Sequence, residues 1–184
     1  PYFPFTTSSE RLSGFLEPDI GITSDGLDLY APYFLVLSGK SDITMAPRLL
    51  RDRGVGLEVN YRYLTRDNLN NYLDLMYFPG DKKAKKYYAL NDARWAFKLK
   101  DSRQWHNING EINWAKSSDP MVLLDLPSSL TSVANQQDHY LPQSIKVSTN
   151  LNNLSISIAR QGYQSLNPFL SGGYVKEPEV ELAY

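Results

Sequence analysis

The sequence predicts an all-β fold, an antiparallel up-and-down meander of about ten strands. Apolar and polar residues alternate with a period of two along most of the 184-residue chain, whereas a helical period is hard to find. Short connections between these segments alternate with long ones after the middle of the chain. In a meander alternate loops fall on the same rim, so one rim would carry short turns and the other long loops.

The first two strands should form a hairpin around Asp25-Gly26, because a two-residue type I′ turn needs residues that tolerate positive φ. This turn would place Ser24 opposite Leu27 and Ile22 opposite Leu29. Apolar residues then share one face of the hairpin.

Two prolines interrupt this hairpin. In the expected register Pro18 lies opposite Tyr33 and Pro32 opposite Asp19, so both prolines sit at nearly the same height. Proline has no N–H to give to a sheet, and at about 1 kcal/mol net per hydrogen bond the loss is on the order of 2 kcal/mol. Two interpretations stay open: the prolines weaken a seam with the last strand, or they blunt an exposed edge.

The later strands follow from alternation at 55–63, 94–100, 108–114, 145–148, 154–158 and 179–184. In these segments apolar residues lie on one face and polar or charged residues largely on the other. The polar residues expected to line a hydrated lumen are Glu58, Asn60, Arg62, Lys98, Lys100, Glu111, Asn113 and Lys146.

The connections favour a transmembrane barrel. Short ones are expected at Ser38–Ser41, Thr65–Asn68, Ser102–Asn107 and Leu151–Asn153, and long ones at Gly80–Ala93, Ser117–His139 and Gln164–Gly173. Outer-membrane barrels have short periplasmic turns and long external loops. Aromatic residues near several strand ends would suit the interfacial girdles of such a barrel. The basic cluster Lys82–Lys86 falls in a long loop, where we expect a solvated surface.

Composition and motifs give no sign of an enzyme. The net charge is −1 and the chain has no cysteine, so nucleic-acid binding and thiolate metal sites are not expected. The two histidines, His106 and His139, have no partner at metal or triad spacing. No nucleophile elbow or phosphate loop occurs. We therefore expect no catalytic residue, no metal and no cofactor.

Several stretches in series resemble one family. They are 11–18 (RLSGFLEP), 30–34 (YAPYF), 42–48 (DITMAPR), 53–54 (RG) and 61–64 (YRYL). Together, in this order and spacing, they resemble the LptD (OstA) family of LPS-assembly outer-membrane proteins. Beyond Asp81 the resemblance thins to isolated pieces.

The resemblance implies a segment of a large barrel in the bacterial outer membrane. Residues 1–11 would be a lead-in from a periplasmic jellyroll domain, and 12–184 the N-terminal barrel strands. Pro18 and Pro32 match prolines thought to loosen a lateral gate through which lipopolysaccharide enters the outer leaflet. The implied partners are lipopolysaccharide, an LptE-like plug lipoprotein inside the barrel and periplasmic jellyroll bridge proteins of the same pathway.

Two other functions remain open from the residues alone. The first is a passive porin-like channel, closed by these ten strands. The second is a soluble β-sandwich that binds carbohydrate or protein.

Overall fold

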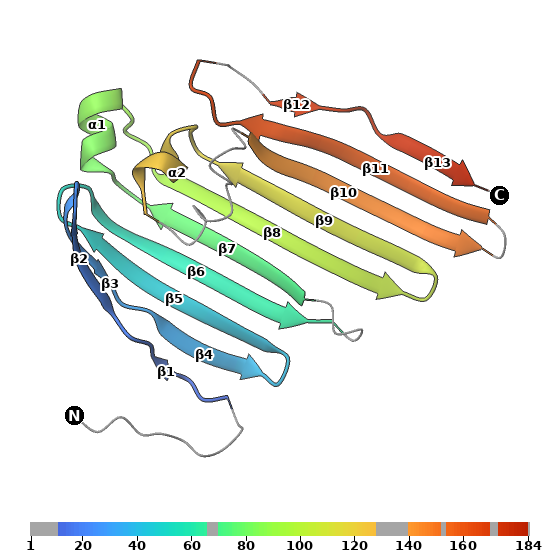
Figure 1. The fold of residues 1–184 in the computed structure, drawn as a ribbon, viewed down its shortest axis with the longest axis horizontal. Coiled ribbons are helices and arrows are strands. Elements are labelled where there is room, and N and C mark those ends of the chain that lie inside the picture. The colour runs from blue at the N-terminus through green and yellow to red at the C-terminus, as the bar shows by residue number, and fades with distance from the viewer. Residues whose placement is uncertain (1–10, 66–69, 128–139, 152–153, 170–172, 184) are drawn as a thin grey trace.

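One antiparallel sheet contains every strand that the computed structural model describes, in residues 11–65, 70–127, 140–151, 154–169 and 173–183 (Figure 1). Its strands are β1 (Gly14–Phe15), β2 (Asp19–Thr23), β3 (Gly26–Tyr30), β4 (Tyr33–Ser38), β5 (Ser41–Leu50), β6 (Gly54–Leu64), β7 (Asn70–Phe78), β8 (Arg94–Trp105), β9 (Ile108–Ser117), β10 (Tyr140–Leu151), β11 (Leu154–Ser165), β12 (Tyr174–Val175) and β13 (Glu179–Ala183). Two helices, α1 (Lys82–Tyr88) and α2 (Val122–Asp125), lie in the long loops.

The thirteen pieces make ten long strands. β1 and β2 are the two halves of one interrupted strand that faces β4 and β3, and β12 and β13 both pair with β11. β3 and β4 are likewise two halves that pair with β5. Every other strand pairs with the strands before and after it in the chain. The predicted all-β meander of about ten strands is therefore confirmed.

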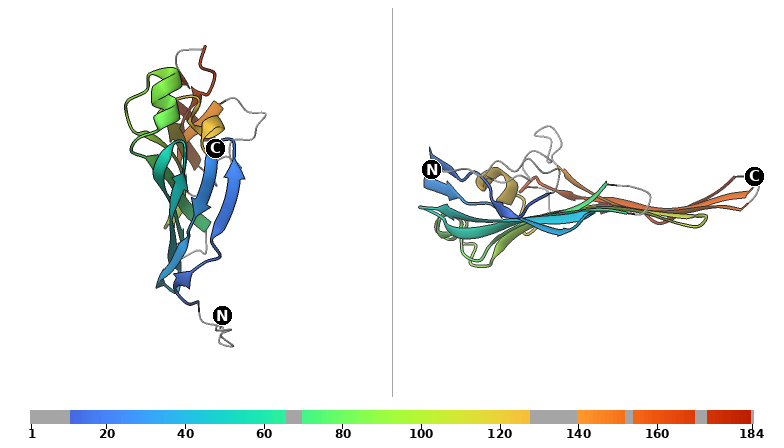
Figure 2. Two further views of the ribbon diagram at one scale, coloured as in Figure 1. Left: turned by 90° about the vertical axis from the view of Figure 1, so that its left-hand side faces the viewer. Right: turned by 90° about the horizontal axis from the view of Figure 1, so that it is seen from below.

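The sheet is open and curved (Figure 2). Within the described residues, the β1/β2 strand pairs only with β3 and β4, at the opposite end of the sheet from β12 and β13. The strands that the structure describes therefore form neither a barrel closed by ten strands nor two sheets packed as a sandwich. Neither described helix is long and apolar enough to cross a membrane.

Strand pairing sorts the side chains onto two faces. Met45, Val59, Leu75 and Phe97 lie in one row across four strands, and we call their side of the sheet the apolar face. The next row holds Thr44, Asn60, Asp74 and Lys98 and belongs to the polar face. Period-two alternation within each strand would not by itself separate apolar from polar side chains across the whole sheet. The strands also pair in registers that place apolar residues beside apolar residues.

A small apolar core covers part of the polar face. α2 lies on the concave side of the sheet (Figure 2), and its loop contributes Val122, Leu123 and Leu126 to the core. The strands contribute Leu50, Met76, Phe78, Ala96, Ala115 and Leu141. The core therefore holds the loop between β9 and β10 against the sheet.

Short and long connections separate as expected in the second half of the chain. The turn 39–40 and the turn 106–107 lie at the rim that we call the short-turn rim, and α1, α2 and the loop after β11 lie at the long-loop rim (Figure 1). In the first half of the chain, the long-loop rim also carries the short turns 24–25 and 51–53. The expected loop Ser102–Asn107 is too wide, because Ser102 pairs with Glu111 and Trp105 with Ile108. A left-handed His106, with φ of 53°, allows this tighter turn. Residues 66–69, 128–139 and 152–153 of other expected loops lie outside the described residues.

The first hairpin turns one residue earlier than expected. Thr23 pairs with Gly26, so the two-residue turn is Ser24–Asp25 rather than Asp25-Gly26. The Thr23 hydroxyl accepts a hydrogen bond from the Asp25 amide at 3.1 Å, and Gly26 has a φ of +80°, which glycine tolerates. Asp25-Gly26 is a favourable turn dipeptide in the sequence, but the side-chain contacts of Asp25 determine which two residues form the turn.

The register of the hairpin changes accordingly. Ile22 lies opposite Leu27, not Leu29, and Ile20 lies opposite Leu29. The expected pairing of Pro32 with Asp19 is also wrong, since Asp19 pairs with Tyr30. The expected faces survive between β2 and β3, because a shift by two residues leaves each side chain on its side of the sheet. The expected pairing of Pro18 with Tyr33 is wrong, since Tyr33 pairs with Phe15, three residues away.

We predict that Gly56→Ala destabilises the sheet, because a Cβ at this position on the polar face would overlap the ring of Phe78. Overpacking of this kind costs about 1–3 kcal/mol. Denaturant unfolding of the full-length protein in detergent would measure the cost. Gly110→Ala is the matched control, since a Cβ there meets nothing within 4 Å. Equal stabilities of the two variants would contradict the packing argument.

Candidate functional site

The first hairpin is interrupted at the same height on both strands. Between the pairs Phe15–Tyr33 and Asp19–Tyr30 the first strand has the three residues 16–18, and the second has the two residues 31–32. One extra residue on one strand is a β-bulge, which bends that strand and leaves part of it unpaired. The Leu16 amide still donates to the Pro32 carbonyl at 2.9 Å. The bulge, with Pro18 in it, therefore replaces the continuous ladder that strand alternation alone would give.

A third proline lies in the same band. Pro47 of β5 lies opposite Ala31, whose amide donates to the Pro47 carbonyl at 3.2 Å. In an antiparallel ladder such a pair exchanges two hydrogen bonds, but Pro47 has no N–H to return. Strand alternation does not single out Pro47, although the short turn at Ser38–Ser41 would place it beside the hairpin prolines.

Three neighbouring strands thus lack donors in one band, which we call the proline band: Pro18, Pro32 and Pro47. Pro32 is buried on the polar face, whereas Pro18 and Pro47 are exposed. At about 1 kcal/mol per lost hydrogen bond, the band weakens the sheet by on the order of 3 kcal/mol. It lies next to the free edge of the described sheet.

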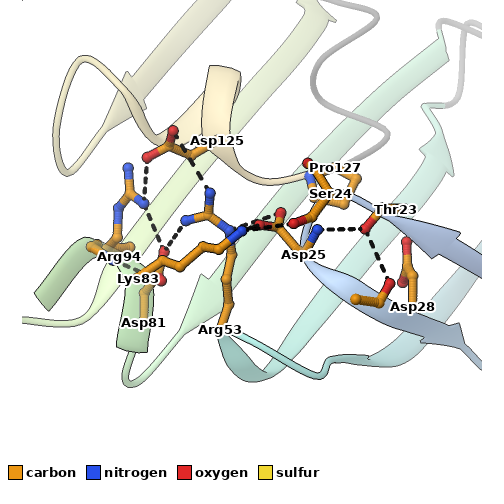
Figure 3. Close-up of polar contacts among 12 residues, drawn as sticks. Thr23, Ser24, Asp25, Asp28, Arg53, Asp81, Lys83, Arg94, Asp125 and Pro127 are labelled. Atoms are coloured by element: carbon orange, nitrogen blue, oxygen red, sulfur yellow. Dashed lines mark hydrogen bonds and ion pairs between the residues drawn. The ribbon is translucent and has the colours of Figure 1, made fainter. Parts of the chain in front are cut away.

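The turn at the tip of the hairpin is, by contrast, held in place by ion pairs and a hydrogen bond. The buried carboxylate of Asp25 contacts Arg53 at 2.9 Å and Lys83 at 2.6 Å, and Lys83 also donates to the Ser24 carbonyl at 2.8 Å. These contacts join the turn 24–25 to the β5–β6 turn and to α1 (Figure 3). Lys83, expected in a solvated basic cluster, is therefore a structural contact of the hairpin.

Asp25 belongs to a larger group of charges, the rim cluster, which lies at the long-loop rim (Figure 3). Its members are Asp25, Arg53, Asp81, Lys83, Arg94, Asp119 and Asp125. Arg94 is only 1% exposed and contacts Asp81 at 2.7 Å, Asp119 at 2.8 Å and Asp125 at 2.9 Å. The cluster links the hairpin to both helical loops, and its charges are paired, as burial demands.

Asp81 has two roles in this cluster. It caps α1 by accepting from the Ala84 amide at 3.0 Å, and it contacts Arg53 at 2.9 Å. Burial alone would raise the pKa of Asp81, but the bonds from Ala84, Arg94 and Arg53 hold it below its ordinary value. For Asp25, burial is likewise outweighed by Lys83 and Arg53, so its pKa is also lowered. Both carboxylates are thus stabilised in their charged form.

Residues predicted to face a lumen share the polar face but do not form one site. Glu58 contacts Arg48 at 2.9 Å, Asn60 contacts Asp74, and Arg62 contacts Asp42 at 2.8 Å. The Lys98 ammonium lies 5.5 Å from the centre of the Tyr72 ring. The remaining four residues line one cavity of about 300 Å³: Lys100, Glu111, Asn113 and Lys146.

The described residues offer no group of three or more metal-ligating side chains. His106 packs against Trp105 in the short turn, and His139 lies outside the described residues. The first hairpin thus combines a proline band with a turn held by ion pairs at the long-loop rim.

Comparison with known proteins gives a consistent set of relatives. No family model matches the chain. The chain is 32% identical over 190 residues to the LPS-assembly protein LptD of Ralstonia nicotianae, covering 100% of the chain and 22% of that protein. It is 30% identical over 189 residues to LptD of Acinetobacter baylyi, again with 100% and 22% covered. With LptD of Legionella pneumophila it shares 29% identity over 181 residues, 91% of the chain and 21% of that protein. The chain spans about a fifth of the length of these curated relatives.

We predict that the rim cluster loses stability in acid. A carboxylate whose folded pKa is lowered stabilises the fold at a pH above its unfolded pKa, here 3.8 for Asp25 and Asp81. This stabilisation is lost as the pH falls through the lower, folded pKa. The thermal unfolding midpoint should therefore be nearly constant from about pH 8 to pH 5 and fall below about pH 4. A flat profile down to pH 2 would contradict the prediction.

We predict that Asp25→Asn frees the tip of the hairpin. Removing one partner of a buried ion pair costs about 3–5 kcal/mol, and the loss should be local because the side chain of Asp25 carries both ion pairs of this turn with the cluster, to Arg53 and Lys83. Amide hydrogen exchange should become faster in β2 and β3 and stay unchanged in β8 and β9. Asp52→Asn, at the neighbouring exposed carboxylate, is the control and should leave exchange in the hairpin unaltered.

Proposed function

The chain is a region of an LptD-family protein, and from this premise we propose that it forms N-terminal strands of an outer-membrane barrel that takes part in lipopolysaccharide assembly. The matches to LptD proteins run along all or most of the chain, beyond the first 81 residues that carry the resemblance in the sequence. The apolar face would contact lipid, and the polar face would line the lumen. The protein would act at the bacterial outer membrane and without catalysis.

One observation carries the mechanism: the proline band lies beside the free edge of the sheet. In a closed barrel the β1/β2 strand would have to pair with a last strand across a seam. A strand that is bulged and short of donors pairs less strongly than a regular one. The seam would therefore open at lower cost than any other strand pair, and Pro18 and Pro32 would act as the lateral gate for lipopolysaccharide.

The two rims support an orientation. Long loops belong on the external side of an outer-membrane barrel and short turns on the periplasmic side. The rim cluster and both helices would then face outward. Residues 1–11 would enter from the periplasmic side, as expected for a lead-in from a jellyroll domain, although residues 1–10 lie outside the described part of the chain.

Partners follow from the same geometry. An LptE-like plug lipoprotein would contact the polar face, where Lys98, Lys100, Glu111 and Asn113 point to one side of the sheet. Lipopolysaccharide would pass between this face and the gate. Periplasmic jellyroll bridge proteins of the same pathway would deliver it at the short-turn rim.

The test replaces the gate prolines in the full-length protein by Pro18→Val and Pro32→Val, singly and together. Valine restores a donor and suits a strand, so we expect a stiffer seam and reduced delivery of lipopolysaccharide to the cell surface. Disulfide trapping across the seam would report opening directly, and surface labelling would report delivery. The double variant should be more impaired than either single variant.

Pro142→Val is the matched control. Pro142 lies in β10, opposite Tyr163 and away from the first hairpin. This variant should leave delivery unchanged. Normal delivery and normal seam opening in the gate variants would refute the proposed role of the proline band.

A further inference from the structure

A second cavity lies on the polar face at the short-turn rim. Its volume is about 370 Å³, within the usual range of ligand pockets. The side chains that surround it come from the segment before β1, the β4–β5 turn and the adjoining ends of β5, β6 and β7. They are Arg11, Lys40, Asp42, Arg62, Tyr63, Leu64, Asn71 and Tyr72. The cavity is separate from the rim cluster, which lies at the other rim.

The cavity is cationic. Among the described lining residues, Arg11, Lys40 and Arg62 are positive and Asp42 is the one carboxylate, so these residues carry a net charge of +2. Asp42 is 3% exposed and is shared by both arginines: Arg62 donates to one of its oxygens at 2.8 Å, and Arg11 donates to the other. Within the described residues Lys40 has no carboxylate within ion-pair distance. The described residues of the cavity therefore carry more positive charge than the Asp42 carboxylate neutralises.

The arginines also keep donors available. Each guanidinium has five N–H groups, and the contacts with Asp42 occupy one nitrogen of each. The Arg62 and Arg11 side chains are 54% and 43% exposed, so a ligand in the cavity has access to them. Arg62 therefore presents a planar fork of the kind that binds phosphate oxygens in pairs.

The walls are already held in place. Beneath the cavity, the pairs Asp42–Arg62 and Arg62–Tyr72 join β5, β6 and β7 in register. The Leu64 amide donates to the Lys40 carbonyl at 2.8 Å, which fixes the Lys40 turn beside the end of β6. A ligand would thus meet a preformed pocket and lose less free energy in ordering it.

We propose that this cavity binds a phosphate monoester on the sugar headgroup of a glycolipid. The charge and the free guanidinium donors select phosphate, and the volume suits a phosphorylated sugar better than a bare ion. The inference rests on the proposed function, which brings lipopolysaccharide to this rim. β5 carries both Asp42 of the cavity and Pro47 of the proline band, so the cavity would hold the headgroup on the short-turn side of the gate as the lipid enters.

The experiment measures the affinity of the full-length protein for three probes, in detergent and in the presence of the proposed LptE-like lipoprotein. Three probes are compared: lipopolysaccharide with its sugar phosphates, the same lipopolysaccharide after enzymatic removal of phosphate, and inorganic phosphate. Lys40→Gln and Arg62→Gln should each weaken binding of the phosphorylated form by about tenfold, a typical effect of one charge-assisted hydrogen bond. Neither variant should alter binding of the dephosphorylated form.

Asp42→Asn gives a result of opposite sign. It removes the competing carboxylate and frees donors of both arginines, so we expect tighter binding of the phosphorylated form. A purely structural role of Asp42 would instead weaken binding. Lys116→Gln removes one positive charge from an exposed site on the apolar face and should change nothing. Lys40 is exposed in a turn, so its variant tests the site even where Arg62→Gln disturbs folding.

Three outcomes would overturn the proposal. The first is equal affinity of the protein for both forms of lipopolysaccharide. The second is that the variants lose affinity for both forms by the same factor. The third is that inorganic phosphate binds as tightly as the phosphorylated lipid, which would assign the site to free phosphate. The first outcome leaves the proposed function intact, because the protein still binds its lipid. Failure to bind lipopolysaccharide in either form would remove the proposed function as well.

Discussion

The backbone hydrogen-bond ladder is the constraint on which the rest of this sheet depends. Each N–H in a strand needs an acceptor, and a sheet of ten long strands satisfies this need by pairing neighbours in register. Where Pro18, Pro32 and Pro47 remove donors, the first strand bulges and both strands of the hairpin divide into halves. Within the hairpin the weakness is confined to one band, because β1 pairs regularly with β4 on one side of it and β2 with β3 on the other.

The rim cluster and the small core restrict what this band can do. Asp25 ties the tip of the hairpin to Arg53 and Lys83, and Arg94 ties the helical loops to the same cluster. The hairpin is therefore anchored at the long-loop rim and loosened below it.

Much of the fold could be predicted from local patterns. The alternation in 55–63 places Glu58, Asn60 and Arg62 on one face, and the structure has them there. Helix α1 was not predicted, although Asp81 before Lys82–Tyr88 is a favourable N-cap. The α2 helix has four residues, which is too short for a helical period to be recognised in the sequence. Its stability comes from packing on the sheet.

The sequence by itself determined the fold class, the two faces, the alternation of short and long connections and the presence of prolines in the first hairpin. Each of these features can be read from residues that are close together in the chain. Only the tertiary structure decided the turn at Ser24–Asp25, the position of Pro47 in the proline band, the rim cluster and the cationic cavity. The physical reason is distance along the chain: Lys83 meets Asp25 across 58 residues, and Arg48 meets the Pro127 carbonyl across 79. Contacts of that range fix register and charge pairing, and no local period encodes them.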